Sequence, residues 1–156
     1  MNRTDPLIPD DRTHTDPAEL DPAATPAHRS GRFLVLDSLE LHRAGPRITC
    51  IVKLRKRDQC FRGEASELDT VPGRARAAAR ATLAAAAQAV EAYSFGLEGS
   101  QYIDLFSRRY VAVSVEAVQH RRFVILSGIV ALDAARSPED AVCLATLRAI
   151  DRWIGL

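Results

Sequence analysis

Residues 81–85 read Ala-Thr-Leu-Ala-Ala, and residues 145–149 read Ala-Thr-Leu-Arg-Ala, 64 positions later in the chain. The same offset relates Leu-Glu-Leu at residues 39–41 to Ile-Asp-Leu at residues 103–105. Matching stretches at one fixed offset are typical of an internal repeat. We therefore predict that the chain contains two related halves, and that this duplication decides the fold.

Length and composition limit the class of protein. The chain has 156 residues, of which 47% are hydrophobic and 26% charged, with a formal net charge of +1. These values are typical of a soluble domain with one core, and the charge does not favour nucleic acid as a partner. The four histidines have no metal-ligand spacing, and Cys50, Cys60 and Cys143 lie in apolar patterns. We expect no metal, no cofactor, no membrane span, reduced core cysteines and a cytoplasmic location.

Residues 1–31 differ from the rest of the chain. Asp-Pro pairs occur three times there among Thr, Ala and His, and large apolar residues are few. Such a segment cannot bury enough apolar surface to offset its ordering entropy. We predict a disordered, mildly acidic tail, either inert or a tether for a partner. Residues 32–156 are then a single domain of two repeats, at about 32–95 and 96–156.

Each half is predicted to contain three strands, from alternating apolar and polar residues and from turn residues between them. The expected strands are 33–42, 48–54 and 59–65 in the first half, and 101–106, 110–119 and 123–132 in the second.

Each half is predicted to end in a helix. Asp69 or Thr70 can cap the first, with Pro72 in its first turn, and its Ala-rich sequence favours a helix to Tyr93. In the second half, residues 137–140 read Ser-Pro-Glu-Asp, a cap followed by proline and two acids that suit the helix dipole. Gly155 is placed to end this helix.

The expected fold class is therefore α+β: a duplicated β-β-β-α unit with pseudo-twofold symmetry, in which antiparallel sheets are covered by two helices. The small side chains of the first helix suit a close contact with another helix or sheet. Such a contact can lie between the halves or across a homodimer, and we favour a homodimer.

This order of elements, with Gly63 and Gly128 near the ends of the third strands and an acid in the loop before each helix, resembles the C-terminal regulatory domain of 2-isopropylmalate synthase. The resemblance covers about residues 33–153. It implies a duplicated, dimeric domain that binds an amino acid such as leucine near the loops leading into the helices. Asp69 and Asp133 are the loop acids that match. No stretch corresponds to the synthase's catalytic barrel, so we expect a stand-alone module without its activity.

The loops before the helices are the candidate site. Unpaired N–H groups at two helix N-termini, brought together by pseudo-symmetry, can hold a small carboxylate. The residues predicted to bind such a ligand are Gly63, Asp69, Thr70, Gly73, Gly128, Asp133 and Ser137.

Two other functions stay open. Glu40 and Asp104 occupy equivalent strand positions, and an enzyme could use them as an acid–base pair in a pocket at the pseudo-twofold interface. Basic residues gather in turns at 55–57, 108–109 and 121–122, where an RNA-binding module would contact phosphates, although solvated turns explain them more simply.

Overall fold

The structure of this protein is a computed structural model that describes residues 33–155. The chain divides into two units, Met1–Gly31 and Arg32–Leu156, and the described residues belong to the second. The tail predicted over residues 1–31 lies outside the described residues. The elements are β1 (Val35–Ala44), β2 (Arg47–Lys56), β3 (Gln59–Leu68), α1 (Val71–Ala89), β4 (Ser94–Leu105), β5 (Arg108–Gln119), β6 (Arg122–Ala131) and α2 (Pro138–Ile154).

The six strands form two separate antiparallel sheets with strand orders β1-β2-β3 and β4-β5-β6. Within each sheet, every strand pairs with its neighbour in the sequence, and the helix that follows packs on its own sheet. The predicted α+β class and the duplicated β-β-β-α arrangement are therefore confirmed.

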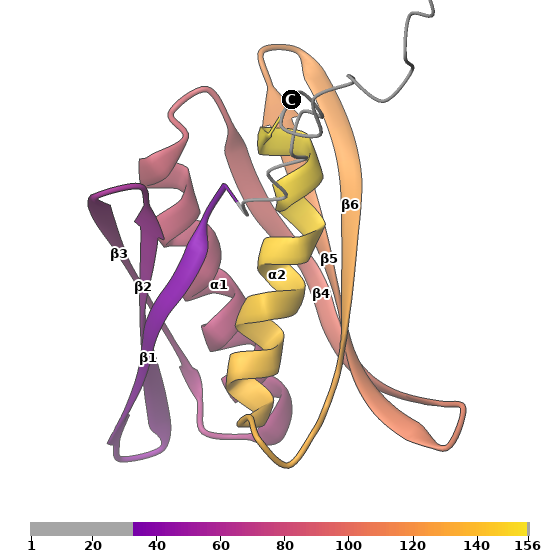
Figure 1. The fold of residues 1–156 in the computed structure, drawn as a ribbon. Coiled ribbons are helices and arrows are strands. Elements are labelled where there is room, and N and C mark those ends of the chain that lie inside the picture. The colour runs from indigo at the N-terminus through magenta and orange to yellow at the C-terminus, as the bar shows by residue number, and fades with distance from the viewer. Residues whose placement is uncertain (1–32, 156) are drawn as a thin grey trace, which may run out of the picture. The chain divides into compact units, whose positions relative to one another are not determined.

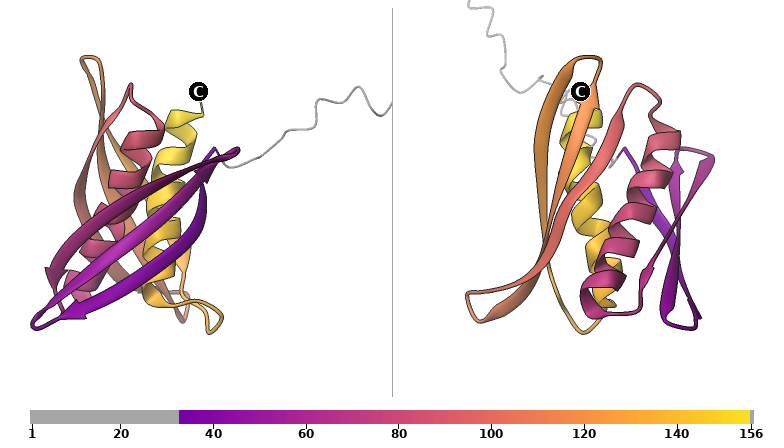
Figure 2. Two further views of the ribbon diagram at one scale, coloured as in Figure 1. Left: turned by 90° about the vertical axis from the view of Figure 1, so that its left-hand side faces the viewer. Right: turned by 180° about the vertical axis from the view of Figure 1, so that it is seen from behind.

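The two helices lie side by side between the two sheets, as Figures 1 and 2 show. α1 contacts β2, β3 and β4, whereas α2 contacts β5 and β6 and touches β1. Both helices begin at the same end of the folded unit, the lower end in Figure 1. The central strands supply the buried sheet faces, with Ile48, Cys50, Val52 and Leu54 from β2 and Val111, Val113, Val115 and Ala117 from β5.

Two glycines bring sheet and helix backbones into direct contact. A Cβ atom on Gly63 would lie 2.0 Å from the carbonyl oxygen of Ala81 and 2.4 Å from the amide nitrogen of Ala85. A Cβ atom on Gly128 would lie 1.9 Å from the carbonyl oxygen of Ala145. These backbone atoms belong to the two repeated Ala-Thr-Leu stretches. The sequence repeat thus corresponds to a helix–sheet contact made twice.

The first strand of the second half is longer than predicted. It begins at Ser94 rather than at residue 101, because residues 94–99 pair with β5 instead of forming a break. The register shifts between Leu97 and Gly99, which marks a β-bulge. A β-bulge inserts an extra residue into one strand, often beside a glycine, while the hydrogen bonds to the neighbouring strand continue. Gly96 and Gly99 therefore belong to β4 and do not end it.

The end of α1 and one cysteine also differ from expectation. α1 ends at Ala89 rather than at Tyr93. Cys60 is exposed, because it lies on the outer face of β3 with Arg62 and Glu64, and the prediction that it is a core residue was wrong. The other two cysteines are free and buried, and burial raises the pKa of Cys50 to about 11 and that of Cys143 to about 12.

Candidate functional site

A cavity of about 180 Å³ lies between the N-termini of α1 and α2. Val71 and Pro138, the first residues of the two helices, both line it. The cavity is smaller than the roughly 300–1,000 Å³ typical of sites for drug-sized ligands, so it suits a small metabolite. Its walls are formed by Val71, Arg74, Tyr102, Arg109, Leu132, Pro138 and Glu139.

The two helix starts beside the cavity form as the sequence predicts. The Thr70 hydroxyl accepts a hydrogen bond from the Gly73 amide at 3.0 Å, and the Ser137 hydroxyl accepts one from the Asp140 amide at 3.1 Å. Each cap satisfies one of the free N–H groups of a first turn. The positive ends of two helix dipoles therefore meet at the cavity, and this favours a negative group there.

Arg74 stands at the α1 side of the cavity and is held by Asp69. The Arg74 Nε atom lies 2.5 Å from the Asp69 carboxylate, and the Nε of Arg43 lies 3.2 Å from its other oxygen. The hydrogen bond from Arg74, followed by the charges of both arginines, lowers the pKa of Asp69 despite partial desolvation. Asp69 is therefore ionised and engaged with arginines.

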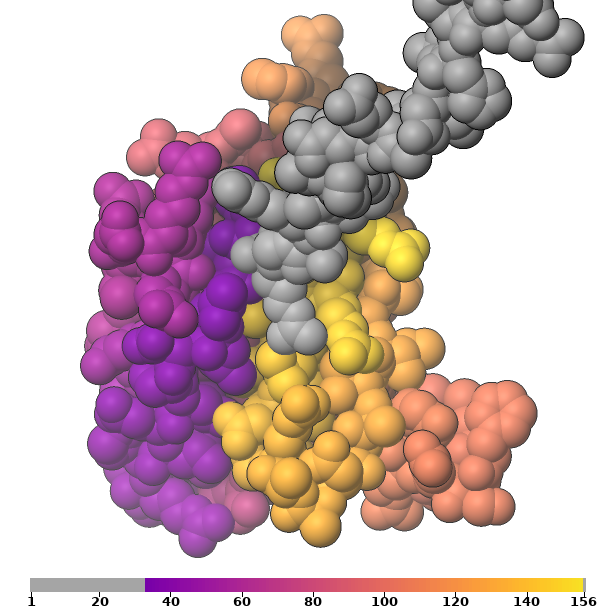
Figure 3. Space-filling model, in the orientation of Figure 1, coloured from indigo at the N-terminus to yellow at the C-terminus, as the bar shows by residue number. Residues whose placement is uncertain are grey.

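The β4–β5 hairpin, which stands out from the surface in Figure 3, supplies the opposite wall. Arg109 Nε lies 3.0 Å from the Asp104 carboxylate, and this hydrogen bond lowers the pKa of Asp104. The Arg109 carbonyl accepts a hydrogen bond from the Leu132 amide at 2.9 Å, which fixes the loop before α2. Burial, and next the negative charge of Glu139, raise the pKa of Tyr102.

Three of the seven predicted binding residues are linked to the cavity through a helix cap or an ion pair. Thr70 and Ser137 cap the helices and immediately precede the lining residues Val71 and Pro138. Asp69 contacts the cavity only through Arg74. Their direct contact with a ligand stays a prediction.

The other four predicted residues contact a helix backbone or their own loop. Gly63 and Gly128 pack against the middle of the helices, and a Cβ atom on Gly73 would lie 2.0 Å from the Leu68 carbonyl oxygen. The Asp133 carboxylate accepts a hydrogen bond from the Ala135 amide at 3.0 Å, within its own loop. The structure does not bring these four residues to the walls of the cavity.

Sequence reasoning did not place Tyr102, Leu132 or Glu139 at a ligand site. Tyr102 lies in the middle of a strand, and Leu132 directly follows another. Glu139 stood out only as an acid that suits the helix dipole. No local motif links these positions, because the cavity forms only when the hairpin packs against both helix N-termini.

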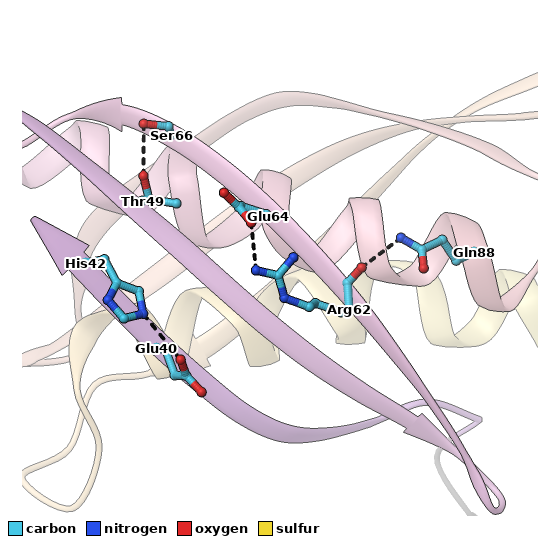
Figure 4. A network of polar contacts seen from close by, with 7 residues as sticks. All are labelled: Glu40, His42, Thr49, Arg62, Glu64, Ser66 and Gln88. Carbon is cyan, nitrogen blue, oxygen red and sulfur yellow. Dashed lines mark hydrogen bonds and ion pairs between the residues drawn. The ribbon is translucent and has the colours of Figure 1, made fainter. Parts of the chain in front are cut away.

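The carboxylates considered for an enzyme each have a neighbour in their own sheet. Glu40 lies 3.3 Å from His42 on the outer face of β1, as Figure 4 shows, and Asp104 pairs with Arg109. The pKa of Asp104 is lowered, whereas a general acid needs a raised one.

Part of the basic charge in the turns is also engaged. Lys56 Nζ donates a hydrogen bond to the Ala89 carbonyl at 2.9 Å, at the end of α1, and lies 4.4 Å from the centre of the Phe33 ring. Arg109 pairs with Asp104. These two side chains therefore have roles within the fold.

In comparisons with known proteins, no family model and no curated protein matches the chain. Among residues 33–155, no three His, Cys, Asp or Glu side chains are grouped so that they could hold a metal ion. In the same part of the chain, every helix is too short or too polar to span a membrane.

Proposed function

We propose that this protein is a non-catalytic regulatory or assembly module, which binds a small metabolite such as an amino acid in the cavity between the two helix N-termini. One observation carries this proposal: the cavity has walls from both repeats. Val71 and Arg74 belong to the first repeat, and Tyr102, Leu132 and Glu139 to the second. A ligand in the cavity therefore contacts both halves and stabilises their arrangement, which is how a small molecule can change the surface offered to a partner protein.

The chemistry of the walls supports a small ligand with both polar and apolar parts. Val71, Leu132 and Pro138 offer apolar contacts, and the helix N-termini favour a carboxylate. The resemblance to the regulatory domain of 2-isopropylmalate synthase points to the same kind of ligand near the same loops.

A thermal-shift screen tests ligand binding. Apolar amino acids and small carboxylates are added to the purified protein, and at least one amino acid is expected to raise Tm. A ligand at about 100 times its Kd adds about 2.7 kcal/mol of stability, which raises Tm by on the order of 10 °C in a domain of this size.

Two variants make the screen specific to the cavity. Val71→Trp places a large side chain at the cavity mouth and is expected to abolish the shift, because Val71 lines the cavity and is 65% exposed. Val35→Trp, on β1 outside the cavity, is the matched control and should keep the shift. If no compound stabilises the wild-type protein, only an assembly role remains.

For the assembly role, we propose a homodimer formed through the outer face of the β4-β5-β6 sheet. Val118, Phe123, Ile125 and Ile129 lie on this face and are 38–62% exposed, while their neighbours along β6 face α2. The outer face of the other sheet is polar, with the Glu40–His42 and Arg62–Glu64 pairs and the Thr49–Ser66 hydrogen bond drawn in Figure 4. These apolar side chains share the outer face with Ser114, Glu116 and Ser127, so the surface mixes apolar and polar groups, as non-obligate interfaces do.

Molar mass measured by light scattering after gel filtration tests the dimer. The wild-type protein is expected to have the mass of two chains, and Ile125→Lys the mass of one, because burying a lysine at the interface costs desolvation free energy. Ile51→Lys makes the same change on the outer face of the other sheet and should remain dimeric. A monomeric wild-type protein would exclude this interface.

A further inference from the structure

Glu139 is a largely buried residue at the cavity, and its charge acts on the Arg74 guanidinium without an ion pair between them. Its residue is 8% exposed, and of the residues that line the cavity it is the only acid. Within residues 33–155, its side chain takes part in no hydrogen bond and no ion pair. A carboxylate on a largely buried side chain usually accepts hydrogen bonds, so the free oxygens of Glu139 call for a specific explanation.

The other charged groups around the cavity already have partners. Arg74 pairs with Asp69, and Arg109 pairs with Asp104. Asp140, in the same turn of α2 as Glu139, accepts a hydrogen bond from the Ser137 hydroxyl at 2.9 Å. Glu139 lies within electrostatic reach of Arg74 but forms no ion pair, so it is the ionic group of the cavity with the most free acceptor capacity for a ligand.

The helix dipole alone does not account for this arrangement. An acid in a first turn is stabilised by the dipole when it is solvated, and Asp140 already has that position. Glu139 instead faces a cavity whose remaining walls are partly apolar. A divalent metal ion is a poor fit, because Mg²⁺ and Ca²⁺ take roughly six to eight oxygen ligands and Glu139 is the only carboxylate in the lining. An ammonium group needs only one carboxylate and a few further acceptors.

We propose that Glu139 binds the ammonium group of the ligand, so that the cavity selects amino acids over the 2-oxo acids with the same side chains. The ligand's carboxylate then lies toward the helix N-termini, and its apolar side chain toward Val71 and Leu132. This assignment depends on the ligand-binding function proposed above and adds the group that decides which small carboxylates are accepted.

Calorimetric titration of the full chain tests the assignment. L-Alanine, L-valine, L-leucine and L-isoleucine are compared with their 2-oxo acids at pH 7. We expect the tightest amino acid to bind at least about tenfold more strongly than its 2-oxo acid, since a charged hydrogen bond is lost in the latter. This comparison uses the wild-type protein and is independent of how any variant folds.

Two variants locate the effect. Glu139→Gln keeps the shape of the side chain and is expected to weaken binding of the amino acid at least about tenfold while leaving binding of the 2-oxo acid within about twofold. Asp140→Asn removes the same charge from the same helical turn, away from the cavity lining, and should leave both affinities within about twofold. Equal affinities for amino acid and 2-oxo acid, unchanged in Glu139→Gln, would overturn the role of Glu139 and leave the proposed function standing. Absence of binding by every compound would overturn both.

Discussion

Replacing Gly128 by alanine is expected to lower the free energy of unfolding by about 3 kcal/mol. The new Cβ atom would lie 1.9 Å from the carbonyl oxygen of Ala145 and 2.7 Å from the amide nitrogen of Ala149. Both atoms belong to the helix backbone and cannot rotate away. α2 would have to move off β6, yet it also contacts α1, so the movement disturbs packing between the two halves. Gly63→Ala should have a similar effect, because the contact is repeated in the first half.

Urea unfolding measures this effect, with Gly99→Ala as the matched control. Gly99 also lies in a strand, but a Cβ atom there would have no neighbour within 4 Å. The control should therefore stay within about 0.5 kcal/mol of the wild-type protein. If Gly128→Ala were as stable as the control, the helix and sheet could not be in the contact described here.

Replacing Ala78 by leucine is the second change with a large expected effect, a loss of roughly 2 kcal/mol or more. Ala78 lies in α1 and is fully buried, and its carbonyl oxygen lies 3.9 Å from the Sγ atom of Cys143 in α2. The helices thus approach each other through small side chains, and three additional carbon atoms would force them apart. Leucine and alanine both favour helices, so helix propensity contributes little to the loss.

Thermal unfolding tests the close contact between the helices. Ala87→Leu, at a half-buried position of the same helix, is the control and should change stability by less than Ala78→Leu. If both variants lost the same stability, the loss could not be assigned to the contact between α1 and α2.

The repeat predicted the fold well because its two copies form the same local structure and the same helix–sheet contact. Thr82 and Thr146, at equivalent positions, donate hydrogen bonds of 2.8 Å to the carbonyls of Ala78 and Val142 in their own helices. The caps at Thr70 and Ser137 depend only on the residues that follow them. Helix propensity, helix N-caps and the alternation of apolar residues all indicated the same elements, and together they predicted the fold class.

The candidate site was less accessible to sequence reasoning. We predicted a site at the loops before the helices. The cavity lies beside these loops, since Val71 and Pro138 line it. Tyr102 and Glu139 come from segments that are distant in the sequence and meet only through packing. The sequence analysis also missed the start of β4. Glycines usually indicate a break between elements, but here they accompany a β-bulge inside the strand.

Chemical-shift mapping of the amide groups by NMR tests most directly that the cavity between the helix N-termini is the ligand site. The protein is titrated with the amino acid that gives the largest thermal shift. The largest shift changes are expected at Val71, Tyr102 and Glu139, which line the cavity on its different sides. Changes centred instead on Tyr93 and Trp153, which line a cavity of about 250 Å³ beside the C-terminal end of α2, would contradict the account.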